Sequence, residues 1–311
     1  MADAVPSIGQ TPATRELLRR LDLDVRMKLD GLLHGDYRGL VPGHGSELGE
    51  TRDYAPGDDV RRIDWNVTAR MQATHVRETI ADRELETHAL VDLSPSVDFG
   101  TTQQEKRDLV LAAVAAIGLL TARVGNRFGA HIIGPDTAVS IPPAQGRAHL
   151  MAILHRLADA PRGSSGSVDL ARGLHRLAGQ ARRRGLIVVV SDFIAPDGWQ
   201  QRLARLSTRH DVLAVEVVDP RELEIPDVGL VVLTDPETGV QREVATNRSS
   251  VRKRYAEAAK DQRDHIAAGL RDAGVSHLQL RTDRDWILDL AQFMVGRRKR
   301  HDGAAKPAAR L

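Results

Sequence analysis

Two short segments, far apart in the chain, place carboxylates and hydroxyls directly after an apolar run. The first is ALVDLSPS, residues 89–96, in which an aspartate and two serines form a D-x-S-x-S pattern. The second is LIVVVSD, residues 186–192, which ends in a serine and an aspartate. Carboxylate and hydroxyl oxygens are the hard donors that Mg²⁺ prefers in proteins. The two segments therefore indicate a divalent-cation site that consists of Asp92, Ser94, Ser96 and Asp192.

A sheet must bring these two segments together. Both apolar runs are typical of buried strands, and expected strands alternate with expected helices along most of the chain. We expect helices over about 103–124, 146–159, 169–183, 198–208, 249–272 and 284–296, further strands at 127–133, 138–141, 212–218 and 277–280, and a hairpin over 229–246. This alternation predicts an α/β fold with a doubly wound, mostly parallel sheet. Ligands bind beyond the carboxyl ends of such strands, where Asp92 and Asp192 meet if their strands are neighbours.

The N-terminal part follows a different pattern. Residues 1–12 are expected to be disordered, and leucines at helical spacing predict a helix over about 14–33. The remainder of the segment 13–83 is rich in Gly, Asp and Arg, which indicates turns and short strands. We therefore divide the chain into this segment, a larger domain over 84–296, and a basic tail over 297–311 that is expected to be disordered.

Residues 52–70, RDYAPGDDVRRIDWNVTAR, concentrate opposite charges around a tryptophan. One interpretation is a buried, ion-paired network that fixes the N-terminal layer on the larger domain. The other is a partner-docking surface, since Trp and Arg are favoured where interfaces gain most of their energy. That surface would consist of Asp58, Asp59, Arg61, Asp64, Trp65 and Arg70.

The same run closely resembles the signature of the bacterial domain-of-unknown-function 58 family, in the string R-x-Y-x-P-G-D-D…I-D-W…A-R. In addition, D-x-S-x-S after one strand and S-D after a later strand resemble a von Willebrand factor type A domain with its metal-ion-dependent adhesion site. The resemblance covers roughly residues 30–220. It implies a von Willebrand A-like sheet with an N-terminal β-rich layer, a bound Mg²⁺ (or Mn²⁺ or Ca²⁺), and work beside a MoxR-type AAA ATPase.

The resemblance carries the metal ligands over to Asp92, Ser94, Ser96 and Asp192, but the middle motif departs from the family pattern. Val168 stands where a threonine ligand is usual, and valine has no side-chain donor. Ser167, one residue earlier, either substitutes as a ligand or caps the following helix. The whole cluster also has a plainer interpretation. Asp92 and Ser94 could satisfy backbone donors of the turn, and Ser96 could cap the next helix.

Composition excludes several functional classes. The chain of 311 residues has no cysteine, which rules out disulfides, thiolate metal sites and cysteine nucleophiles. A net charge of +2 argues against a dedicated nucleic-acid binder. The longest apolar run, residues 109–120, is too short to span a bilayer, and the N-terminus has no signal-peptide pattern, so we expect a cytoplasmic protein.

These observations lead to a ranked set of hypotheses about function. The preferred one is a non-enzymatic protein-interaction module, an adaptor of a MoxR-type AAA ATPase in chaperone-like maturation or stress response. It would dock an acidic partner side chain through the metal ion. The alternatives are a structural protein with a degenerate metal site and, less favoured, a metal-dependent hydrolase that uses the same cluster.

Overall fold

The computed structural model describes residues 51–54, 63–71, 73–77, 85–102, 104–123, 125–163 and 166–304. The chain divides into two compact units, Pro42–Glu84 and the remainder, and each is described by itself. The disorder predicted for residues 1–12 and the helix predicted over 14–33 lie outside the described residues.

The smaller unit contains a short hairpin and one helix. Strand β1 (Thr51–Asp53) pairs antiparallel with β2 (His75–Arg77). Helix α2 (Trp65–Met71) lies between them in the chain. Asp64, directly before this helix, caps its N-terminus. Its side-chain oxygen accepts from the Val67 amide at 3.2 Å, and its carbonyl accepts from the Thr68 amide at 2.9 Å.

The larger unit is built on a six-stranded sheet with the order β10-β7-β6-β3-β4-β5. Its strands are β3 (Glu86–Asp92), β4 (Arg127–Ile133), β5 (Ala138–Ala144), β6 (Leu186–Ser191), β7 (Asp211–Val218) and β10 (Ser276–Arg281). All neighbouring strands are parallel except β5, which pairs antiparallel with β4 at one edge. The predicted α/β fold with a doubly wound, mostly parallel sheet is confirmed. The strand order reverses between β3 and β6.

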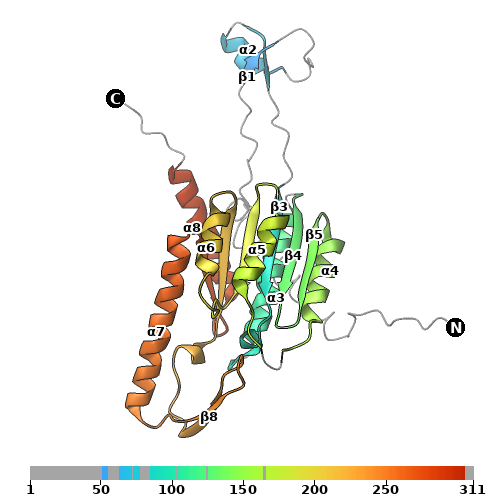
Figure 1. Cartoon of the computed structure of the whole chain (residues 1–311). Coiled ribbons are helices and arrows are strands. Elements are labelled where there is room, and N and C mark those ends of the chain that lie inside the picture. The colour runs from blue at the N-terminus through green and yellow to red at the C-terminus, as the bar shows by residue number, and fades with distance from the viewer. Residues whose placement is uncertain are drawn as a thin grey trace, which may run out of the picture. The chain divides into compact units, whose positions relative to one another are not determined.

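Helices cover both faces of this sheet (Figure 1). One layer consists of α3 (Lys106–Arg123), α4 (Arg147–Ala158) and α8 (Trp286–Ala304), and the other of α5 (Leu170–Gln180), α6 (Trp199–Ser207) and α7 (Ser249–Asp272). Residues of β3 alternate between the layers, with Ala89 and Val91 in the first apolar cluster and Leu90 in the second. Because both faces are buried, the central strands are continuous apolar runs, which is why they stand out in the sequence.

A two-stranded hairpin lies apart from the sheet, in the segment between β7 and α7. Its strands β8 (Leu230–Thr234) and β9 (Gln241–Ala245) pair with each other, as the sequence predicted. Figure 1 shows this hairpin near one end of the sheet, beside the start of α7.

The tail requires a correction. Residues from 297 were predicted to be disordered, but α8 continues to Ala304. Arg297 is 3% exposed and donates a hydrogen bond to Asp211, so a charged residue that suggested a solvated tail is held against the sheet instead. Residues 305–311 lie outside the described part. Within the described part, no helix combines the length and apolarity that crossing a membrane requires.

Candidate metal and docking site

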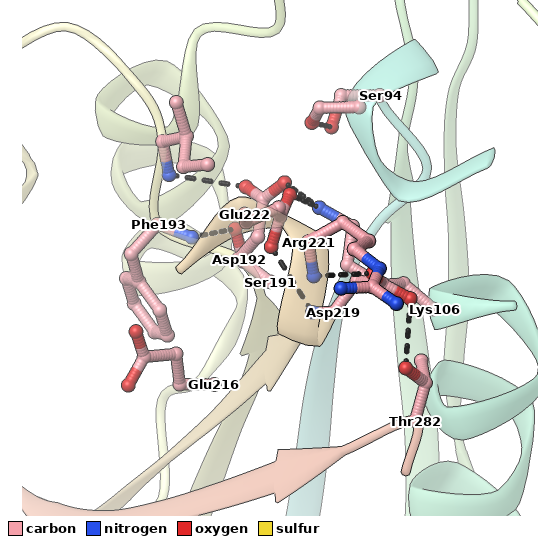
Figure 2. A network of polar contacts seen from close by, with 12 residues as sticks. Ser94, Lys106, Ser191, Asp192, Phe193, Glu216, Asp219, Arg221, Glu222 and Thr282 are labelled. Carbon is pink, nitrogen blue, oxygen red and sulfur yellow. Dashed lines mark hydrogen bonds and ion pairs between the residues drawn. The ribbon is translucent and has the colours of Figure 1, made fainter. Parts of the chain in front are cut away.

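Asp92 and Asp192 lie at the carboxyl ends of the two central strands, β3 and β6, between which the strand order reverses. Asp92 is the last residue of β3, and Asp192 directly follows the last residue of β6. The strands pair in parallel with Val91 opposite Val190, so their carboxyl ends are level. Doubly wound sheets form their binding crevice at this switch point. Figure 2 shows the polar network around Asp192.

Asp92 is buried, with 3% of its surface exposed, and both of its carboxylate oxygens have partners. Oδ1 accepts from the Ser94 amide at 2.9 Å, and Oδ2 accepts from the Ser191 hydroxyl at 2.7 Å. Burial and then the nearby charge of Asp192 raise the pKa of Asp92 to about 6. The charge of Asp192 therefore disfavours the ionisation of Asp92, a repulsion that a bound cation would relieve.

The serines of the D-x-S-x-S pattern belong to the same cluster. After Asp92 the chain enters the short 3-10 helix η2 (Pro95–Asp98), where proline suits the first turn because no amide hydrogen is needed there. The hydroxyl oxygens of Ser94 and Ser96 lie 3.0 Å apart, and both residues are buried. The Ser96 hydroxyl also bonds to the Asp192 carboxylate. The structure thus brings together all four side chains of the predicted set.

Ser167 has a different environment. It is exposed, and its hydroxyl bonds to the carboxylate of Glu237. Val168, at the usual threonine position, is packed in the apolar layer of α5, α6 and α7. The interpretation of Ser167 as a helix cap is wrong. Because α5 begins at Leu170, the cap position falls on Asp169, whose side chain accepts from the Arg172 amide at 2.8 Å.

A lysine that the sequence analysis missed completes the cluster. Lys106 is the first residue of α3 and is fully buried. Its Nζ donates to Asp192 Oδ2 at 2.8 Å and to Glu222 Oε1 at 2.5 Å. Burial alone would raise the pKa of Asp192, but the Lys106 ammonium and its hydrogen bond hold that pKa below the ordinary value. Burial likewise opposes the charge of Lys106, yet Asp192 and Glu222 raise its pKa above the ordinary value.

Glu222 contacts both Lys106 and a second cationic side chain, Arg263. It lies in the short 3-10 helix η3 (Pro220–Glu222), just after β7, and its side chain accepts from the Asp219 amide in a capping box. Arg263 on α7 donates to Glu216 at 2.8 Å, to Glu222 at 3.4 Å and to the Asp192 carbonyl at 3.1 Å. The pattern D-P-R-E directly after an apolar strand was the sequence signal that could have located Glu222 at this edge.

The hairpin brings a further carboxylate to the same edge. The Gly166 amide donates to the Glu237 carbonyl at 3.0 Å, so the tip of the hairpin contacts the loop that contains Ser167. Asp235 stabilises the tip by accepting from the amides of Glu237 and Thr238. Burial and then the negative charge of Asp192 raise the pKa of Glu237. An acidic side chain of the chain itself therefore lies within electrostatic reach of Asp192.

The donor set fits a hard divalent cation in type and in charge. Within the described ranges no group of three or more His, Asp and Glu side chains is arranged to hold a metal, so any site here depends on the serine hydroxyls as well as the carboxylates. The buried carboxylates of Asp92, Asp192 and Glu216 and the half-buried carboxylate of Glu222 outnumber the Lys, Arg and His side chains that contact them, which are Lys106, Arg263 and His277. This excess of negative charge in a buried place favours the binding of a cation.

Half of the second predicted surface lies outside the described residues, which exclude Asp58, Asp59 and Arg61. Of the remainder, Asp64 is buried at the start of α2, Trp65 is 70% exposed, and Arg70 is exposed. The interpretation as a buried network that fixes this segment on the larger domain stays a prediction. The docking interpretation of Trp65 and Arg70 stays a prediction.

Comparison with known proteins identifies related chains. The uncharacterized protein Rv1480 of Mycobacterium tuberculosis is 49% identical over 289 residues, which cover 93% of this chain and 91% of that one. The uncharacterized protein MAV169 of Mycobacterium avium is 43% identical over 160 residues, 51% of this chain and 94% of that one.

Solved structures give more distant likenesses. The conserved hypothetical protein BatB of Bacteroides thetaiotaomicron is 12% identical, with a TM-score of 0.41 over 69% of this chain and 99% of that one. The von Willebrand A domain of SpRpn10 is 12% identical, with a TM-score of 0.39 over 67% of this chain and 93% of that one. Likenesses of this size carry no argument about function.

The family comparison covers both regions that the sequence singled out. A family model described as "Protein of unknown function DUF58" matches residues 50–265, which include the signature run 52–70 and both carboxylate-bearing segments. The resemblance of residues 52–70 to this family is therefore confirmed, and the chain belongs to the DUF58 family.

Proposed function

We propose that the chain is a protein-interaction module that docks an acidic side chain of its partner through a divalent cation. Asp92, Ser94, Ser96 and Asp192 would hold the ion. The observation that supports this most is the clustering of these four buried side chains, from two strands, at the switch point of the sheet. A structural turn would need some of these hydrogen bonds, but it would not need two mutually repelling carboxylates.

The chemistry of the donors favours Mg²⁺, with Mn²⁺ and Ca²⁺ as close alternatives. All the donors are hard oxygens, and no softer ligand is present in the set. Two carboxylates balance the charge of one divalent ion and leave coordination positions for water or for a partner carboxylate. The ion would then act as a bridge that recognises an acidic residue.

The partner that we propose is a MoxR-type AAA ATPase, which the chain would serve as a cytoplasmic adaptor in chaperone-like maturation or stress response. This choice rests on the family resemblance in residues 52–70, and the exposed Trp65 offers a second place for contact. We propose no catalytic role for the cluster. Metal-dependent turnover of a phosphoester that is lost in Asp92→Asn would contradict that part.

A binding experiment tests the proposal. The purified full-length chain is immobilised, and binding of a MoxR-type ATPase from the same organism is measured with Mg²⁺, with chelator, and with the variant Asp92→Asn. We expect binding in Mg²⁺ and its loss in the other two cases. Asp272→Asn is the matched control, because Asp272 is an exposed carboxylate at the end of α7, which leads to the amino end of β10.

The outcomes separate the parts of the proposal. Binding that persists both in chelator and in Asp92→Asn would refute the metal bridge but keep the adaptor. An absence of binding under every condition would refute the ATPase as the partner. The alternative of a scaffold with a degenerate site is favoured by the burial of Val168 at the usual threonine position. Crystals soaked in Mn²⁺ that show no density between Asp92 and Asp192 would support that alternative.

A further inference from the structure

Lys106 is unusual among the lysines of a folded protein because its whole side chain is buried among carboxylates. Lysine is almost never fully buried unless it is paired. Here it has two partners, Asp192 Oδ2 at 2.8 Å and Glu222 Oε1 at 2.5 Å. One of these partners belongs to the proposed metal-binding set and the other does not.

The ammonium acts on the same carboxylate as the proposed ion would. Asp192 Oδ1 accepts from the Ile194 amide at 3.0 Å, and Oδ2 accepts from Lys106. An ammonium is a compact positive charge, and its hydrogens compete for the lone pairs that a hard cation would take. A divalent ion beside Asp192 would also be repelled by the ammonium at short range.

We propose that Lys106 is an internal cation that competes with the divalent ion for Asp192. This inference rests on the proposed function, in which the donor set binds a divalent cation. Without the ion, Lys106 neutralises Asp192 and occupies its Oδ2 by a hydrogen bond. When an ion binds, the ammonium gives up Asp192 and stays paired with Glu222, whose carboxylate lies outside the donor set. Lys106 is thus a positioning residue that sets the affinity of the site for metal.

The position of Glu222 gives Lys106 a place to remain charged. Glu222 is held by its capping box with Asp219 and by Arg263, so it stays in place whether or not Asp192 changes partner. An ammonium that left Asp192 without such a partner would be buried and uncompensated, at a large cost in free energy. The second carboxylate makes the exchange feasible within a buried site.

A purely structural ion pair predicts a different result on substitution. If Lys106 only supports α3 and η3, its removal loosens the cluster and weakens metal binding or leaves it unchanged. If it competes with the ion, its removal frees Asp192 and strengthens binding. The sign of the change in affinity therefore separates the two roles.

The test measures Mn²⁺ binding to the full-length protein by the loss of the free-ion signal in electron paramagnetic resonance. We expect Lys106→Met to bind Mn²⁺ at least about ten-fold more tightly than the wild type, because a repelling charge beside the ion is removed. The matched control is Lys260→Met, at an exposed lysine of α7, which we expect to leave the affinity unchanged.

A second pair of variants guards against a failure of Lys106→Met to fold. Lys106→Met combined with Glu222→Gln removes one charge of each sign, and it is compared with Glu222→Gln alone. We again expect an increase in affinity of at least about ten-fold.

Unchanged or weaker binding in both comparisons, with wild-type protein that binds Mn²⁺, overturns the competition and leaves the proposed function intact. If only the variants without Lys106 bind Mn²⁺, the competition is supported and the metal bridge of the wild type is refuted. If folded variants and wild type all fail to bind, both are overturned.

Discussion

Two groups of buried polar side chains lie along strand β3, one at its carboxyl end and one closer to its start. The carboxyl-end group is ionic, with Asp192 and Glu222 held by Lys106. The other group is centred on two histidines, His88 on β3 and His131 on β4, whose rings are stacked with centroids 5.4 Å apart. His88 Nδ1 and His131 Nε2 lie 3.2 Å apart, so one of them carries the proton of a neutral hydrogen bond.

The difference lies in how each group tolerates burial. Burial, followed by the charge of His88, lowers the pKa of His131 to about 4, so this group avoids charge. At the carboxyl end Lys106 compensates the charges of Asp192 and Glu222, but Asp92 has no cationic partner among its hydrogen bonds and its pKa is raised. A buried group that is neutral needs no ligand, whereas one with an excess of negative charge favours a cation. This contrast separates a structural polar cluster from a candidate binding site within one strand.

The largest effect is expected from removing the compensating charge. Lys106→Met leaves the buried Asp192 without its cation and removes one of the two cations that contact the half-buried Glu222. Breaking a buried ion pair from one side costs about 3–5 kcal/mol. Urea denaturation in the presence of chelator measures this loss, with the exposed Lys260→Met as control. A loss below about 1 kcal/mol would mean that the cluster is not held by charge. Saturating Mn²⁺ should restore part of the stability in Lys106→Met, because the ion supplies the missing charge.

The histidine pair should make stability depend on pH. The pKa of His131 lies at about 4 in the folded chain, below its ordinary value of 6.5. Between these values the unfolded state binds more protons, so the free energy of unfolding falls as the pH is lowered, by about 3 kcal/mol in all. His131→Asn keeps a polar group at the Nδ1 position and should abolish this part of the pH dependence. If the free energy of unfolding changed with pH by the same slope in wild type and in His131→Asn, the buried neutral state of His131 would be contradicted.

Asp92 should have the opposite effect in nearly the same pH range. Its pKa is raised from 3.8 to about 6, so here the folded state binds more protons. The associated stability is present below pH 3.8 and is lost as the pH rises through about 6, a change of about 3 kcal/mol. In the wild type this trend and that of His131 largely cancel. In Asp92→Asn the free energy of unfolding should fall as the pH is lowered, as His131 predicts. In His131→Asn it should fall as the pH is raised, as Asp92 predicts.

A divalent ion offers a direct check of the Asp92 trend. A bound cation favours the charged carboxylate, so saturating Mg²⁺ should remove the trend from His131→Asn protein and leave Asp92→Asn protein unaffected. The free energy of unfolding of His131→Asn is measured against pH with Mg²⁺ and with chelator. Identical curves in the two conditions would mean that the ion does not bind beside Asp92.

Local sequence patterns predicted much of the fold and the core of the candidate site. Buried strands such as 186–190 are continuous apolar runs, and the D-x-S-x-S turn carries its donors within five adjacent residues. Lys106 could not be found in this way. It lies in the charged run E-K-R-D, which is typical of an exposed helix start, and its partners follow other strands. Arg297 was misjudged for the same reason, because its partner Asp211 is distant in the chain.

The smallest effect is expected at the outer end of the histidine group. The Ser140 hydroxyl lies 2.9 Å from His131 Nδ1 and donates to Gln180 at 2.5 Å. Because Ser140 is exposed on the edge strand β5, water can replace its hydroxyl, so Ser140→Ala should cost only about 0.5–1 kcal/mol. Ser140→Thr, which keeps the hydroxyl and suits a strand, should cost less. A loss from Ser140→Ala as large as that from Lys106→Met would show that a neutral group depends on each of its partners as strongly as the ionic one, and the contrast between the two ends of β3 would fail.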